Sequence, residues 1–117
     1  MDLGISLPVF GAGDFVGHAR HAEQVGLESV WMGDHLIPVM PFLDSTLVLA
    51  SVAAVTDRVR LGFGVMVLAL RPVVWAAKQI ATLQHLSGDR VLLGVGAGGA
   101  AHGDAAWRPL TTGPCRR

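Results

Sequence analysis

The stretch of sequence that decides the fold is residues 58–99, which read RVRLGFGVMVLALRPVVWAAKQIATLQHLSGDRVLLGVGAGG. It begins with an apolar, β-branched run over Val59–Leu68, which is followed by Arg71 and Pro72. One amphipathic helical period comes next, then a Ser-Gly stop, a second apolar run over Val91–Val95 and a cluster of glycines. Such a strand–helix–strand unit with short joints is the building block of a parallel sheet.

The residues before this stretch repeat the same alternation. Short apolar runs over Leu3–Pro8 and Ser29–Met32 predict two further strands. A helix over residues 15–25 follows a capping aspartate, and Asp44 or Ser45 can cap a second helix. That second helix is apolar nearly all round, and such helices are usually buried. The order β-α-β-α-β-α-β predicts right-handed crossovers and a parallel sheet.

The alternation stops after Gly99. Residues 100–117 read AAHGDAAWRPLTTGPCRR and keep no period typical of a helix or a strand. We therefore expect one α/β domain over residues 1–99, a parallel βαβαβαβ unit, followed by an irregular tail over residues 100–117. The unit has the pattern of a parallel barrel that is truncated, and a change of reading frame is a further hypothesis for the altered end.

Composition argues against several classes of function. The chain has 117 residues with nine Lys plus Arg and nine Asp plus Glu, so it lacks the basic footprint of a nucleic-acid binder. No apolar run approaches the roughly 20 residues of a spanning helix, and no basic amphipathic helix favours a membrane surface. Cys115 is the only cysteine and forms no internal disulfide, so a cytoplasmic location is expected.

Four segments carry a resemblance to a known family. They are the Gly33-Asp34-His35 strand end, the run RVRLGFGVMVLALRPV, the helix AKQIATLQHLSGDR and the strand LLGVGAGG. Together they resemble the N-terminal part of the luciferase-like monooxygenase family, most of all the branch that uses the deazaflavin F420, with FMN users as the neighbouring branch. The likeness runs from about Leu3 to Gly99. It implies the N-terminal half of a TIM (β/α)₈ barrel with a flavin-type ring at the C-terminal ends of the strands, where this architecture places its active sites.

Asp34 and His35 directly follow the second strand and are the predicted catalytic residues. A histidine can exchange a proton near neutral pH and can hydrogen-bond a substrate or ring oxygen. The neighbouring aspartate could orient the histidine or cap the next segment. The resemblance implies that a histidine in this position lies beside the deazaflavin and serves acid–base chemistry. The alternative is a loop histidine held by a backbone carbonyl.

Two glycine-bearing segments are predicted to contact the cofactor. A glycine inside a strand marks a bulge or a close backbone approach, and the resemblance implies a non-proline cis peptide between Gly64 and Val65 that backs the flavin ring. Residues Gly96, Ala97 and Gly98 follow the fourth strand, where glycine lets backbone N–H groups approach a ligand closely. At both places the alternative is a glycine that serves packing alone.

Other polar and aromatic residues are assigned no site. Arg71 could meet a cofactor phosphate, but a solvated side chain is the favoured interpretation. His18 and His21 lie three residues apart in a helix without a suitably spaced third ligand, so no metal is predicted. Trp31 and Trp75 are interpreted as core residues.

The sequence thus predicts a flavin- or F420-dependent oxidoreductase or monooxygenase that acts on a small organic substrate as a homo-oligomer. F420 is the expected cofactor and FMN the alternative. A second hypothesis is a non-catalytic barrel fragment that dimerises or aggregates, because four barrel strands leave two open edges and an uncovered apolar face. A third is a Rossmann-like NAD binder, because residues 94–99 satisfy G-x-G-x-x-G, although the motif follows the fourth strand instead of the first.

Overall fold

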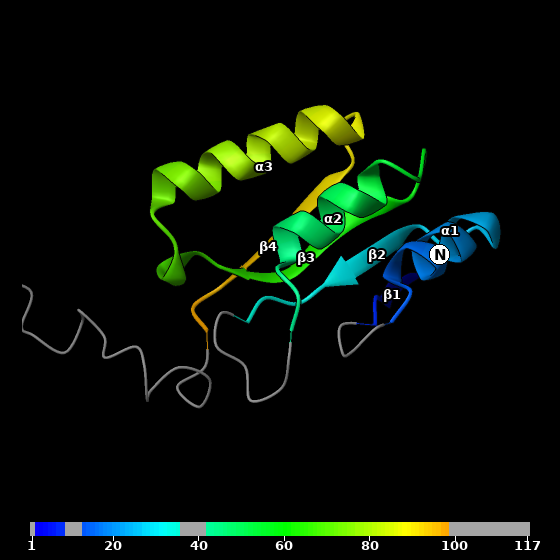
Figure 1. Cartoon of the computed structure of the whole chain (residues 1–117), viewed down its shortest axis with the longest axis horizontal. Helices are drawn as coiled ribbons and strands as arrows, with labels where there is room; N and C mark the ends of the chain where they lie inside the picture. The colour runs from blue at the N-terminus through cyan, green and yellow to red at the C-terminus, as the bar shows by residue number, and fades with distance from the viewer. Residues whose placement is uncertain (1, 9–12, 36–41, 99–117) are drawn as a thin grey trace, which may run out of the picture.

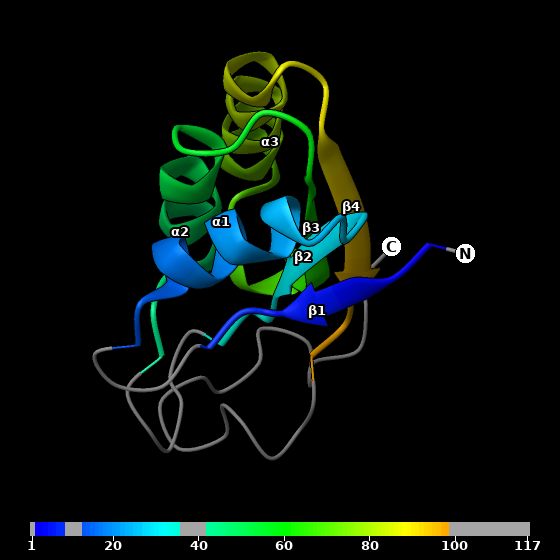
Figure 2. The same ribbon diagram turned by 90° about the vertical axis from the view of Figure 1, so that its right-hand side faces the viewer.

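The fold is a parallel four-stranded sheet with three α-helices on one face (Figures 1 and 2). The computed structural model describes residues 2–8, 13–35 and 42–98. Its elements follow the predicted alternation: β1 (Gly4–Ser6), α1 (Phe15–Gln24), β2 (Ser29–Met32), α2 (Ser45–Ala53), β3 (Arg60–Val67), a 3₁₀ turn (Leu68–Leu70), α3 (Val73–Ser87) and β4 (Val91–Gly96). The strand order is β1-β2-β3-β4, and every pair is parallel.

The strand order distinguishes a barrel from a dinucleotide-binding fold. Each strand pairs with the next strand in the sequence. A dinucleotide-binding sheet instead places its first strand in the interior and reverses the strand order there, whereas a barrel adds its strands in order around a ring. The sequential order therefore confirms the barrel-like unit and contradicts the hypothesis of a Rossmann-like NAD binder.

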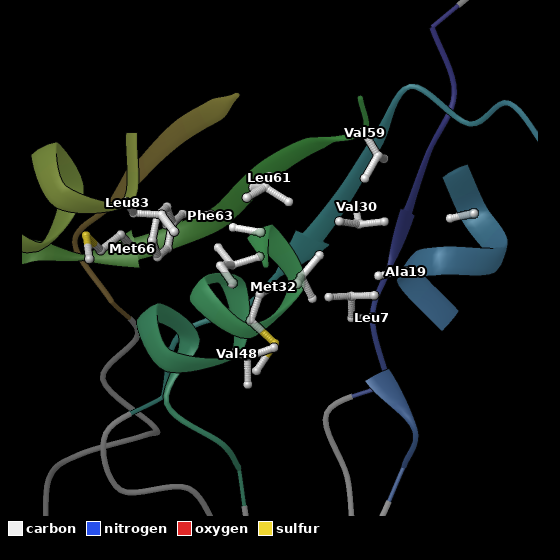
Figure 3. Packing of buried hydrophobic residues seen from close by; sticks show 14 residues of the cluster. Leu7, Ala19, Val30, Met32, Val48, Val59, Leu61, Phe63, Met66 and Leu83 are labelled. Atoms are coloured by element: carbon white, nitrogen blue, oxygen red, sulfur yellow. The ribbon is translucent and has the colours of Figure 1, made fainter. Parts of the chain in front are cut away.

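The hydrophobic core lies between the sheet and the helices (Figure 3). Alternate residues of β2 and β3 point toward the helices, because successive side chains of a strand face opposite ways. The largest fully buried hydrophobic side chains are Val30, Met32, Leu49, Val52, Val59, Leu61, Phe63, Met66 and Leu83. This core fixes the strands whose ends carry the predicted site.

Trp31 covers the other face of the sheet. Its indole N–H donates to the hydroxyl of Ser29 at 2.8 Å. A Cβ on Gly62 of β3 would overlap the ring, and a Cβ on Gly4 of β1 would lie 2.7 Å from the indole nitrogen. Glycines on the two neighbouring strands therefore make room for one large ring that is only partly buried.

Capping residues set the helix boundaries. Asp14 and Asp44 cap α1 and α2, each accepting a backbone N–H of the first turn, at 2.8 Å and 3.0 Å respectively. Aspartate is thus the cap of α2. Pro72 is the N-cap of α3. Gly88 ends α3 in the left-handed conformation with φ of 66°, as is common where a glycine follows a helix.

Two predictions of burial are wrong in part. In α2 the side chain of Leu47 is 70% exposed, although six of the nine residues are buried. Trp75 is 60% exposed, because α3 turns Ala76 and Leu83 toward the core instead. A helix on one face of a sheet keeps an outward side, and the uniformly apolar sequence of α2 does not show which side that is. None of the helices in the described ranges is long and apolar enough to span a membrane.

One carboxylate ties α1 to the start of β3, at the end of the sheet opposite the predicted site. Glu23 accepts the backbone N–H groups of Asp57, Arg58 and Val59, the shortest at 2.6 Å. Burial alone would raise the pKa of Glu23, but the three hydrogen bonds outweigh burial and hold this pKa below its ordinary value of 4.5. The ionised carboxylate therefore stabilises the fold above that pH, and its contribution is lost as the pH falls through the lowered value.

We expect the Glu23→Gln variant to lose about 1–2 kcal/mol of unfolding free energy at neutral pH, because hydrogen bonds to charged groups contribute about 1.5–3 kcal/mol each and this carboxylate is partly exposed. Urea denaturation at neutral pH and near pH 3 measures the loss, which should shrink at the lower pH. Glu28→Gln is the matched control, because Glu28 lies 3.9 Å from Arg60 in a half-exposed pair of small expected effect. An equal loss at both pH values would contradict the prediction.

Candidate functional site

Three strand ends and the segments that follow them lie at one edge of the sheet (Figure 1). β2 is followed by residues 33–35, β3 by the 3₁₀ turn and Arg71, and β4 by Ala97 and Gly98. The C-terminal ends of parallel strands lie side by side, and in barrels these ends carry the active site. The fold thus brings the segments that carry the predicted site residues to one edge of the sheet.

The carboxylate of Asp34 is buried and accepts hydrogen bonds from four donors. The guanidinium of Arg71 donates to both oxygens, from Nη2 to Oδ1 at 2.6 Å and from Nη1 to Oδ2. The backbone N–H of Val67 donates to Oδ2 at 2.8 Å, and the hydroxyl of Ser45 donates to Oδ1 at 3.1 Å. Asp34 therefore connects the end of β2 with the end of β3 and with the starts of α2 and α3.

The surroundings keep Asp34 and Arg71 charged. Burial alone would raise the pKa of Asp34, but the hydrogen bond from Arg71, the N–H of Val67 and the charge of Arg71 outweigh burial and hold this pKa below its ordinary value. The same hydrogen bond raises the pKa of Arg71. A carboxylate held in this way is ionised at neutral pH and carries no proton to donate. The arrangement favours a role for Asp34 in holding the strand ends.

The prediction that Arg71 is solvated is wrong. Its side chain is only 18% exposed and forms the bidentate pair with Asp34, 37 positions earlier in the chain. The sequence contained a signal for this pair: an arginine stands between an apolar strand and a helix start, and a carboxylate ends the preceding strand. Because neighbouring parallel strands end side by side, these two charges are brought together. Ser45, considered only as a helix cap, is a further residue of this cluster.

His35 lies close to the bulge of β3. Its ring packs edge-to-face on Phe42, with ring centroids 4.5 Å apart and planes at 70°. A Cβ built on Gly33 would lie 3.9 Å from Nε2 of His35 and also 3.9 Å from the carbonyl oxygen of Gly64. The imidazole nitrogen and this carbonyl oxygen therefore both lie beside Gly33. Phe42 is a neighbour of the histidine that the sequence did not single out.

The bulge of β3 contains the cis peptide bond that the resemblance implied. The Gly64–Val65 bond is cis, and the pairing of β3 with β4 shifts register between Phe63 and Met66. The side chain of Val65 is 41% exposed and lies over β4, where a Cβ on Gly96 would overlap it. The two predicted cofactor-contacting segments are thus in contact with each other.

Glycines keep the end of β4 free of side chains beside this bulge. Gly96 sits under Val65, and a Cβ on Gly98 would lie 3.1 Å from Cγ1 of Val67. Gly98 also has φ of 79°, a conformation that favours glycine. Ala97 between them is exposed. The absent Cβ atoms of Gly96 and Gly98 therefore make room for the side chains of Val65 and Val67, which is the packing role that the sequence left open as the alternative.

The remaining histidines of the described segments lie outside this cluster. His18 and His21 are exposed on α1, and Nδ1 of His18 lies 2.6 Å from the backbone carbonyl of Asp14. His85 is exposed on α3. Within residues 2–8, 13–35 and 42–98, no group of three or more His, Cys, Asp or Glu side chains is arranged to hold a metal ion.

Comparison with known proteins identifies the family. The profile of the family described as luciferase-like monooxygenase matches residues 2–107, most of the chain. The chain therefore belongs to the luciferase-like monooxygenase family, as the resemblance predicted.

Individual relatives point to redox enzymes. The F420-dependent glucose-6-phosphate dehydrogenase of Amycolatopsis mediterranei is 40% identical over 99 residues, which cover 78% of this chain and 29% of the relative. The coenzyme F420-dependent tetrahydromethanopterin reductase of Methanopyrus kandleri has a similar structure, with a TM-score of 0.76 and 31% identity over 88% of this chain and 29% of that chain. The chain thus spans less than a third of the length of these relatives, which are oxidoreductases.

An FMN-binding protein shares the fold as well. The oxygenating constituent of 3,6-diketocamphane monooxygenase from Pseudomonas putida, solved in complex with FMN, has a TM-score of 0.74 over 85% of this chain and 30% of that chain. At 21% identity this likeness concerns the fold alone.

Proposed function

We propose that this chain forms the cofactor-facing part of an F420-dependent oxidoreductase that transfers hydride between F420 and a small organic substrate. The observation that carries the proposal is the cluster at the strand ends, where His35, the Gly64–Val65 bulge and the glycine edge of β4 lie together. The F420-dependent relatives support the choice of F420. FMN, with monooxygenation as the reaction, is the alternative within the same family.

The proposed roles follow from the geometry of this cluster. When bound, the deazaflavin ring accepts or donates the hydride. Gly64, Val65 and residues 96–98 back the ring through exposed backbone. His35 exchanges a proton with the substrate, because an imidazole can act as both a proton donor and a proton acceptor. Asp34 contributes by holding the end of β2, since Arg71 and its other donors occupy both of its oxygens.

Titration of the purified chain with F420 and with FMN, followed by fluorescence, tests the proposal. We expect micromolar binding of F420 and a roughly fivefold or greater weakening in the variant His35→Ala, since a hydrogen bond contributes about 1 kcal/mol. His85→Ala is the matched control, because His85 is exposed on α3. Bleaching of F420 absorbance on addition of glucose 6-phosphate tests the first candidate substrate. Binding of FMN without F420 would move the assignment to the FMN branch, and binding of neither would reject the cofactor site.

A second candidate function is a non-catalytic barrel portion that self-associates. The observation in its favour is that β1 and β4 form the two edges of the described sheet and carry exposed apolar side chains, with Ile5 44% and Val95 55% exposed. Unpaired strand edges promote pairing with another chain. A homo-oligomer in the cytoplasm is part of both proposals. Size-exclusion chromatography with light scattering tests the oligomer: a monomer at all concentrations would reject self-association.

A further inference from the structure

Both backbone polar groups of Val67 are held by the ion pair between Asp34 and Arg71. The carboxylate of Asp34 accepts the N–H of Val67 at 2.8 Å, and Nη1 of Arg71 donates to the carbonyl of Val67 at 3.3 Å. The pair therefore holds Val67, the last residue of β3, by hydrogen bonds to its backbone N–H and to its backbone carbonyl. Val67 itself is 6% exposed, so the anchoring point is buried.

The ion pair is linked through the backbone to both parts of the proposed site. Val65, whose side chain covers Gly96, is two residues before Val67 in β3. His35 directly follows Asp34, so the same carboxylate fixes the backbone that carries the imidazole. A shift of the pair would consequently change the distance between His35 and the Gly64–Val65 bulge.

The chemistry of the pair suits positioning better than stabilisation. Replacing a buried ion pair by apolar residues of similar volume is often neutral for stability, so the presence of such a pair is weak grounds for a stabilising role. A bidentate arginine–carboxylate pair, in contrast, fixes direction as well as distance, because the guanidinium fork is planar and rigid. Lysine keeps the charge of arginine but loses this geometry.

We infer that Arg71 and Asp34 are positioning residues that set the gap between His35 and the Gly64–Val65 bulge. This inference rests on the proposed function in one respect: under that proposal, the gap is the space that receives the cofactor ring. The structural part of the inference concerns His35 and the bulge alone and is testable without any cofactor.

The variant Arg71→Lys tests the inference with two readouts. The first is the NMR spectrum of the His35 ring and its cross-peaks to Phe42, which we expect to shift when the fork is lost. The second is F420 affinity by fluorescence titration, which we expect to fall about two- to fivefold, because the imidazole is displaced but, unlike in His35→Ala, still present. Ser45→Ala, which removes one hydrogen bond of 3.1 Å to Asp34, should shift the His35 signals in the same direction by a smaller amount.

Arg90→Lys is the matched control, because the guanidinium of Arg90 also forms several hydrogen bonds but binds the backbone carbonyls of Ala53, Thr56 and Val59, between the end of α2 and the start of β3. We expect Arg90→Lys to lower stability and to leave the His35 signals and F420 affinity unchanged. Unchanged His35 signals in both Arg71→Lys and Ser45→Ala would overturn the inference. If the wild-type chain binds neither F420 nor FMN, the proposed function fails, while the His35 signals still decide the positioning role.

Discussion

Replacing Gly94 by alanine should destabilise the chain by about 3 kcal/mol, at the upper end of the usual cost of overpacking. A Cβ at this position would lie 2.5 Å from the carbonyl oxygen of Phe63, a backbone atom of β3. The backbone there is held by pairing with β4, where Phe63 is in register with Leu93 next to the bulge. Because the obstacle is main chain, rotation of a side chain cannot relieve the overlap. Urea denaturation monitored by circular dichroism measures the loss.

Alanine variants of two other glycines provide a comparison for the loss of stability in Gly94→Ala. In Gly96→Ala the added Cβ meets the side chain of Val65, which is 41% exposed and can shift toward solvent more easily than main chain can, so a smaller loss is expected. In Gly33→Ala the nearest atom is Cζ of Phe42 at 3.4 Å, an ordinary contact, so a change within about 0.5–1 kcal/mol is expected. Equal losses for Gly94→Ala and Gly33→Ala would show that the close approach of β3 and β4 is not the cause.

Replacing Arg90 by methionine should also cost about 3 kcal/mol, because it leaves several buried acceptors without a donor and each unsatisfied group costs about 1–3 kcal/mol. The guanidinium donates to the carbonyls of Ala53, Thr56, Val59 and Ser87 and to the hydroxyl of Thr56, at 2.5–3.1 Å. Arg90 thereby caps the end of α2 and joins it to α3 and to the starts of β3 and β4.

Arg60→Met provides the comparison for Arg90→Met. The side chain of Arg60 is 56% exposed and lies 3.9 Å from Glu28, so its removal should change the unfolding free energy by less than about 1 kcal/mol. Thermal and urea unfolding of both variants measure the difference. A loss for Arg90→Met as small as that for Arg60→Met would mean that water replaces the guanidinium at these carbonyls.

The elements could be predicted from the sequence because their signals are local. Val91–Gly96 and Ser29–Met32 are apolar runs bounded by turn residues, and Gly88 marks the end of α3. These elements needed only periodicity, caps and turn residues. The placement of His35 and the Gly64–Val65 bulge beside one cofactor ring was instead an implication of the family resemblance, and the parallel pairing of β2 with β3 puts the two segments on neighbouring strands.

The clamp formed by Glu23 and the burial of Arg71 were beyond such local signals. Glu23 binds backbone N–H groups 34 to 36 residues away, and those groups are available only because of the path taken by the loop between α2 and β3. The order of the strands places Arg71 and Asp34 at neighbouring strand ends, but it does not show that the guanidinium is buried there. Its burial depends on where α2 and α3 pack, which the sequence pattern does not specify.

The packing of Trp31 against Gly62 makes the two positions interdependent during mutation. A larger residue at Gly62 meets the indole and is excluded as long as Trp31 is present. Once a smaller side chain replaces Trp31, the same change at Gly62 has space on that face. The tolerance of Gly62 is therefore conditional on Trp31, so a scan with Trp31 in place will report Gly62 as intolerant, and a library that varies the two positions together will recover combinations that no single substitution reaches.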